Sequence, residues 1–321
     1  MISKMNKQKI SVISTVLNEE FGIRKFLDSI IAQTKKPNEV VIVDGGSKDN
    51  TFDILKEYSK KYNWIKAFQE KGANIAKGRN IAIRKSKGEI IFTSDSSTIF
   101  EEKWIEKIAR EFKNDIDVVF GTYYTSPQGI IERFLSSRLP DWNKIDPEKF
   151  IPSNRNVAFR RIVWEKIGGF PENLRRADDN WFHDKAHEKR FNYFFVKDAQ
   201  VQWIFNRNFR QMLKLAFLDS KTEGFSSLFL KRKIYLVEIL LMVIFIFILE
   251  GIIFSGKINL LLPLLIIILI FSAIIGGYMG YRKTEDEVAA LGGSFLIIPL
   301  YLAHVSGVIT GMIQKIYKKN E

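Results

Sequence analysis

The chain has 321 residues, 46% of them hydrophobic, and a formal net charge of +13, which suits one large domain or two modest ones. It contains no cysteine, so disulfides, thiol chemistry and Cys-ligated metal sites are excluded. The positive charge accompanies no zinc-finger, RNA-recognition or basic-zipper pattern, so we expect no nucleic-acid partner. Membrane lipids are the better match, because the chain is mostly Ile, Leu, Phe and Gly from Ile234 onward.

The N-terminal part predicts alternating strands and helices. Apolar, β-branched runs indicate buried strands, and apolar residues at helical spacing predict helices between them. The expected strands are 10–16, 39–43, 65–68, 89–94 and 117–124. The expected helices begin near Phe21 and Thr51, and the third covers 75–85. This alternation predicts an α/β fold, with a parallel sheet covered by helices on both faces.

The regular alternation fades between Gly129 and Trp203. Residues 152–170 are expected to be rich in loops, 179–190 to form a helix, and 193–196 and 201–204 to form short strands. Residues 209–218 mix apolar and basic positions, which predicts an amphipathic helix at a membrane surface.

The C-terminal tail predicts membrane-spanning helices. Residues 234–254 and 258–281 each contain about the twenty apolar residues that a span requires. The basic run 231–233 predicts that the preceding domain is cytoplasmic, and we do not expect the N-terminal stretch to be a signal peptide, because its apolar run is short and is broken at Asn18 and Glu19. A third run, 294–313, is uncharged but holds His304. It either spans, against the positive-inside rule, or is interfacial or re-entrant.

Three polar loops are expected at the same edge of the sheet. They are TVLNEE (15–20), DGGSKDNT (44–51) and the start of GANIAKGRNIAI (72–83). Asp44 can accept hydrogen bonds from a base or ribose, and Arg79 can bind a diphosphate as a forked cation. Each motif alone fits a turn, a helix N-terminus or an exposed helix face equally well. Their convergence at the carboxyl ends of adjacent strands favours a nucleotide site.

A fourth strand, in EIIFTSDSST (89–98), ends just before Asp95. The order of these motifs resembles the inverting family 2 glycosyltransferases of GT-A fold. The resemblance continues through SNRNVAFRRIVWEKIGGFPENL (153–174) and ADDNWF (177–182), and covers roughly residues 9–205. It implies a nucleotide-sugar donor, by the family's preference a UDP-sugar. The donor-binding residues that it implies are Thr15, Asn18, Glu19, Asp44, Gly45, Gly46, Arg79, Asn80 and Asp95. The acceptor-binding residues are Ser153, Asn154, Asn156 and Trp181.

The metal motif of that family is incomplete here. The family usually carries Asp-x-Asp after the fourth strand, where a divalent cation bridges protein and diphosphate. This chain reads Asp95-Ser96-Ser97, so the second carboxylate is missing. Because Mg²⁺ and Mn²⁺ prefer oxygen ligands, few of which need come from protein, the resemblance still implies a cation at Asp95, with Ser97 as a weak further ligand.

The pair Asp178 and Asp179 in ADDNWF resembles the acidic acceptor motif of the family. The resemblance makes Asp179 the base that takes the acceptor proton. Asp178 would raise the pKa of the site through like charge. The alternative is a helix N-cap, where Asp is favoured. The Gln-x-x-Arg-Trp signature of processive synthases is absent, which favours transfer of a single sugar.

Residues His183 and His187 have the spacing of a zinc-protease pair, but the acid between them is Asp184 and a third ligand is not identifiable. Solvated helix surface is the simpler interpretation.

The sequence therefore predicts a multi-pass protein of the cell membrane with a cytoplasmic catalytic domain, 1–232, and a membrane region, 233–321, with two to three transmembrane helices. The catalytic domain divides into a donor half (9–125), an acceptor half (126–205) and an amphipathic linker (206–232). The expected acceptor is lipid-linked or a saccharide. A nucleotidyltransferase and a non-catalytic nucleotide-binding membrane partner remain the alternatives.

Overall fold

The computed structural model describes residues 8–113, 115–174, 177–204, 209–226, 261–282 and 285–319. The chain divides into two compact units. We call Met1–Ser126 with Pro140–Phe205 the sheet unit, and Pro127–Leu139 with Asn206–Glu321 the helical unit. Residues 127–139, expected in the acceptor half, group with the helical unit. The expected domain boundary at 232 lies outside the described residues.

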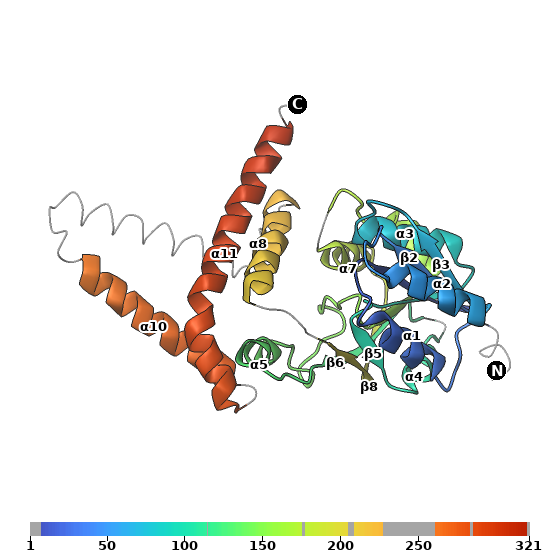
Figure 1. Ribbon diagram of the computed structural model, residues 1–321, viewed down its shortest axis with the longest axis horizontal. Coiled ribbons are helices and arrows are strands. Elements are labelled where there is room, and N and C mark those ends of the chain that lie inside the picture. The colour runs from blue at the N-terminus through green and yellow to red at the C-terminus, as the bar shows by residue number, and fades with distance from the viewer. Residues whose placement is uncertain are drawn as a thin grey trace. The chain divides into compact units, whose positions relative to one another are not determined.

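Within the described residues, eight strands form one sheet in the order β3-β2-β1-β4-β7-β6-β8-β5 (Figure 1). The strands are β1 (Ile10–Val16), β2 (Glu39–Asp44), β3 (Ile65–Gln69), β4 (Ile90–Thr93), β5 (Thr98–Phe100), β6 (Val118–Tyr124), β7 (Val157–Arg160) and β8 (Tyr193–Trp203). Strands β3, β2, β1 and β4 run parallel, as predicted. The second half is mixed, because β7 pairs antiparallel with both β4 and β6. The α/β class is confirmed, and the wholly parallel sheet is corrected to a mixed one.

Helices cover both faces of the sheet because alternate strand residues face opposite cores. Val40 and Ile42 of β2 belong to one core, together with α1 (Ile23–Ile31), α2 (Thr51–Lys61) and α4 (Trp104–Ala109). Val41 and Val43 belong to the other, together with α3 (Ile75–Lys85), α6 (Arg161–Ile167) and α7 (Asp178–Glu188). All four of these valine and isoleucine side chains are fully buried, and each such burial contributes about 1.5–3 kcal/mol.

The region expected to be rich in loops contains a regular strand and a helix that the sequence did not predict. Residues 152–170 contain the whole of β7 and of α6. The two short strands expected between 193 and 204 form one strand, β8, whose pairing with β6 shifts register between Gly121 and Thr122. Strand β5 was also not predicted. Each of these strands pairs with residues distant in sequence, which local periodicity does not report.

The helical unit contains α5 (Ile130–Ser137), α8 (Phe209–Ser226), α10 (Leu261–Tyr281) and α11 (Glu287–Lys319). Helix α11 packs against the other three (Figure 1). Phe134, Met212, Leu296 and Leu300 form a small core between α5, α8 and α11. Among the described residues, Glu287–Tyr317 is long and apolar enough to cross a membrane by length and composition, and Ile266–Tyr281 is a shorter apolar segment. The expected span at 234–254 lies outside the described residues.

Candidate functional site

The loops that follow β1 and β2 are joined by hydrogen bonds. The Asn18 backbone N–H donates to Ser47 Oγ at 2.9 Å, and Asn18 Oδ1 accepts from the Lys48 N–H at 2.9 Å. The Glu19 N–H donates to Thr51 Oγ1 at 2.7 Å. Asn18 has φ of 55°, a left-handed conformation that Asn tolerates better than most residues. The two loops therefore form one surface at the carboxyl ends of adjacent strands.

Asp44 organises the second loop from within. Its side chain is fully buried and accepts from the Gly46 and Ser47 N–H groups, each at 2.9 Å, and from Gln69 Nε2 at 3.0 Å. Gly46 has φ of 98°, and a Cβ on Gly45 would lie 2.9 Å from the Ala73 carbonyl oxygen. The third loop thus lies against the second. The predicted contact of Asp44 with a base or ribose would add to these bonds or replace one of them.

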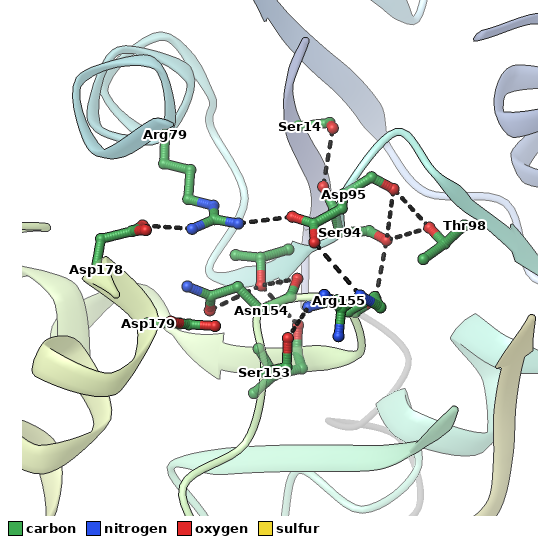
Figure 2. Close-up of polar contacts among 12 residues, drawn as sticks. Ser14, Arg79, Ser94, Asp95, Thr98, Ser153, Asn154, Arg155, Asp178 and Asp179 are labelled. Carbon is green, nitrogen blue, oxygen red and sulfur yellow. Dashed lines mark hydrogen bonds and ion pairs between the residues drawn. The ribbon is translucent and has the colours of Figure 1, made fainter. Parts of the chain in front are cut away.

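Arg79, from α3, joins two distant carboxylates (Figure 2). Its Nη2 donates to Asp95 Oδ1 at 2.8 Å and its Nη1 donates to Asp178 Oδ2. The residue is 4% exposed. Burial opposes its charge, but Asp178 and Asp95 raise the pKa of the guanidinium overall. The sequence predicted that this fork binds phosphate, whereas both of its arms hold carboxylates.

The first turn of α7 carries the two neighbouring acids, Asp178 and Asp179. Ala177 occupies the N-cap, with φ of 58°, so Asp178 and Asp179 lie in the first turn rather than at the cap. Asp178 is 4% exposed, and burial is the largest cause that raises its pKa; the charge of Asp179 adds to this and Arg79 opposes it. Asp179 is half-buried, and its Oδ1 accepts from the Asn180 N–H at 2.9 Å. The more buried acid is therefore the structural one of the pair.

Three predicted binding residues, Asn80, Asn156 and Trp181, make contacts within the fold. Asn80 exchanges four hydrogen bonds with the segment 164–172, which uses both amide hydrogens and both lone pairs of its side chain. Asn156, 1% exposed, donates to the Thr122 and Ala199 carbonyls and accepts from Trp104 Nε1. Trp181 packs against the core formed with α3, α6 and α7. A contact of the Asn80 side chain with the sugar donor would require one of its four bonds to break.

The turn before β7 places Ser153, Asn154 and Arg155 beside Asp95. Asn154 is fully buried, its Oδ1 accepts from Thr93 Oγ1 at 3.3 Å, and its Nδ2 has no hydrogen-bond partner among the described residues. The Nε of Arg155 lies 3.5 Å from Asp95 Oδ2 (Figure 2). The sequence analysis did not select Arg155, although a lone cation between two predicted acceptor residues was the available signal.

The two histidines of α7 do not form a metal pair. Nδ1 of His183 contacts Tyr193 Oη at 2.9 Å, and His187 Nε2 contacts the Phe150 carbonyl at 3.0 Å. His183 is fully buried, not solvated as the simpler interpretation held, and burial chiefly lowers its pKa to about 3. It is therefore a neutral packing residue.

Comparison with known proteins decides the family. The sequence model of Glycosyl transferase family 2 matches residues 11–202, which is more than half of the chain. The chain belongs to glycosyl transferase family 2. It is a glycosyltransferase, and the site described above lies within the matched residues.

Several known proteins are similar to the chain. The chain is 28% identical over 221 residues to glycosyltransferase AglE of Haloferax volcanii, covering 66% of this chain and 72% of the relative. It is 26% identical over 211 residues to a poly(ribitol-phosphate) beta-glucosyltransferase of Bacillus spizizenii, covering 64% of this chain but 33% of the relative. The solved structure of mannosyltransferase PcManGT from Pyrobaculum calidifontis, in complex with GDP-Man and Mn²⁺, matches with a TM-score of 0.58 and 18% identity, covering 97% of this chain and 88% of that one. That likeness confirms the GT-A fold.

The residues around Asp95 fit a divalent cation that brings ligands of its own. Asp95 offers hard carboxylate oxygens and keeps 32% of its side chain exposed. In the part of the chain that the structure describes, no three His, Asp or Glu side chains are grouped so that they could hold an ion by themselves. A cation here would therefore depend on phosphate oxygens and water for most of its ligands.

Proposed function

We propose that this family 2 enzyme transfers a single sugar, with inversion, from a nucleotide-sugar donor to a lipid-linked or saccharide acceptor. The donor is a UDP-sugar by the preference of the family. The observation that carries the proposal is the double contact of Arg79, which brings Asp95 from the donor half and Asp178 from the acceptor half to one point. In a single displacement, the leaving group of the donor and the hydroxyl of the acceptor must both lie next to the anomeric carbon, so the two halves have to come together there.

The loops after β1, β2 and β3 would bind the nucleotide, with Thr15, Asn18, Glu19 and the 44–46 turn nearest to it. Asp95 would hold a divalent cation, which neutralises charge that develops on the diphosphate leaving group. The occurrence of Mn²⁺ with GDP-Man in the solved mannosyltransferase supports the cation. The single carboxylate at Asp95 fits this role if the diphosphate completes the coordination.

Asp179 is the proposed base. An acceptor oxygen attacks the anomeric carbon, its proton passes to the Asp179 carboxylate, and the bond to the diphosphate breaks on the opposite face. Asp178 is paired with Arg79 and 4% exposed, so it is the less accessible acid of the two. A phosphate acceptor would need no such base, so the importance of Asp179 reports the acceptor class.

The helical unit supports a membrane location. Its apolar helix at Glu287–Tyr317 meets the length and composition of a span, and the basic run 231–233 favours a cytoplasmic catalytic domain. We therefore propose a multi-pass protein of the cell membrane that acts at its cytoplasmic face, where a lipid-linked acceptor would be presented.

The decisive experiment supplies membranes that contain the full chain with labelled UDP- and GDP-sugars, with and without Mn²⁺. We expect label to move from one donor into an organic-solvent extract, with release of nucleoside diphosphate. Asp179→Asn should lower the rate of transfer about 10²- to 10⁴-fold, whereas Asp184→Asn, on the same helix, should retain it. Release of pyrophosphate would indicate a nucleotidyltransferase. Absence of transfer from every donor, with wild-type function in cells carrying Asp179→Asn, would indicate a non-catalytic partner.

A further inference from the structure

The charged side chains around Asp95 include more carboxylates than guanidinium groups. Three carboxylates, those of Asp95, Asp178 and Asp179, lie near two guanidinium groups, those of Arg79 and Arg155. A donor diphosphate would add further negative charge to this cluster. The stretch after β4 reads Asp95-Ser96-Ser97 and offers a single carboxylate to a metal ion. A positively charged side chain beside Asp95 would favour binding of the diphosphate with or without a metal.

Arg79 does not provide that charge. Both of its arms donate to carboxylates, and the residue is 4% exposed. A diphosphate could reach its fork only by displacing Asp95 or Asp178.

Arg155 is placed differently. Its Cζ lies over the Trp203 ring, 4.1 Å from the centroid, and 5.1 Å from the centroid of the Tyr123 ring. Cation–π contacts of this kind hold a guanidinium without using its N–H groups, which can still donate to acceptors. Its Nε lies 3.5 Å from Asp95 Oδ2, which is an ion pair but too long for a hydrogen bond. Within the described residues this buried Nε has no hydrogen-bond partner.

The backbone of Arg155 is fixed to the strand that carries the metal motif. Its carbonyl accepts from Ser94 Oγ at 2.9 Å, and its N–H donates to Ser153 Oγ at 3.4 Å. Ser94 directly precedes Asp95, so the backbone of Arg155 is held next to the backbone of Asp95. Arginine prefers planar, two-point contacts with phosphate, and this placement presents its edge where the diphosphate meets Asp95.

We propose that Arg155 binds the donor diphosphate directly and supplies positive charge beside the single carboxylate of Asp95. The proposal rests on the proposed nucleotide-sugar donor. Its consequence is a component of donor binding that needs no metal and that depends on the number of phosphates rather than on the nucleoside.

The test measures binding by titration calorimetry on the full chain in detergent, in EDTA and again with Mn²⁺. The probes are UDP, UMP and uridine, with GDP, GMP and guanosine in parallel. In EDTA, Arg155→Gln should weaken binding of the diphosphate at least tenfold, weaken the monophosphate less, and leave the nucleoside unchanged. Arg155→Lys should lose less, because it keeps the charge without the planar fork. The exposed Arg110, changed to Gln, is the matched control and should behave as wild type.

The outcomes separate this proposal from the function on which it rests. If the wild-type chain binds neither UDP nor GDP under either condition, the donor assignment and this proposal both fail. If the wild-type chain binds a diphosphate and Arg155→Gln binds it equally well, only the role of Arg155 fails. An equal loss for diphosphate and nucleoside would also overturn it, since a purely structural residue would act without regard to phosphate number. Melting curves identify a variant that does not fold. If Arg155→Gln does not fold, the loss of affinity for the diphosphate is compared with that for the nucleoside in Arg155→Lys instead.

Discussion

Replacing Arg79 by Met should destabilise the chain strongly, because it leaves a buried carboxylate without its cation. Asp178 is 4% exposed and Arg79 is its ion-pair partner. Removing one member of a buried pair typically costs about 3–5 kcal/mol. Asp95, 32% exposed, can turn to water when Arg79 is lost, so we place the expected cost near about 3 kcal/mol.

The cost of Arg79→Met should also depend on pH. Burial already raises the pKa of Asp178, and loss of Arg79 removes the cause that opposes this rise. The stability that comes from protonated Asp178 is present below its unfolded pKa and is lost as the pH rises through the folded pKa. The deficit of the variant relative to wild type should therefore be larger at pH 8 than at pH 5.

Chemical unfolding of the full chain in detergent, followed by tryptophan fluorescence, measures both effects. Arg84→Met is the control, because Arg84 lies on the same helix, 52% exposed, and 3.6 Å from Glu172; it should change stability by no more than about 0.5 kcal/mol. Arg79→Met with Asp178→Leu should recover part of the loss, since no unpaired charge then remains at residue 178. The reasoning is refuted if Arg79→Met costs no more than Arg84→Met, or if its deficit is the same at both pH values.

Three further predictions concern single residues. Asp179→Asn should lower the transfer rate about 10²- to 10⁴-fold, with donor affinity by calorimetry unchanged; a loss of affinity instead would contradict a role as base. His183→Asn should flatten the fall in stability between pH 6.5 and 3, by up to about 1.4 kcal/mol per pH unit, because a lowered histidine pKa gives stability that is lost on acidification. Phe182→Leu, which has no titratable group, should leave that slope unaltered. Gly78→Ala should cost about 1–3 kcal/mol, because its Cβ would overlap Thr15; Thr15→Ala in the same chain should recover part of this in melting measurements.

The donor half could be predicted from sequence because its signals are local. Helix α3 has the predicted bounds, and β1 to β4 lie where apolar runs placed them. The expectation that three loops meet at one sheet edge followed from the parallel order of their strands, and the contacts of Asn18 and Gly45 with neighbouring loops confirm it. Strand β7 was missed because its pairing depends on two strands that are distant in sequence.

Individual polar residues were less predictable than the elements that carry them. Asn80 and Asn156 lie in motifs that resemble binding loops, yet their amides satisfy buried backbone and side-chain groups. A buried amide needs such partners whether or not a ligand is near, so residue type does not separate the two roles. Arg155 was missed for the opposite reason. The position of its side chain depends on contacts with Trp203 and Tyr123, which come from other strands.

The contact between Arg79 and Asp178 spans 99 residues and joins the half that carries the donor loops to the half that carries the proposed base. Both partners are buried, so removing either one would leave the other charge without its compensation in the interior. The same contact holds the first turn of α7, which carries both Asp178 and Asp179, beside Asp95. Loss of the contact would therefore disturb the alignment of the proposed base with Asp95 as well as the stability of the fold.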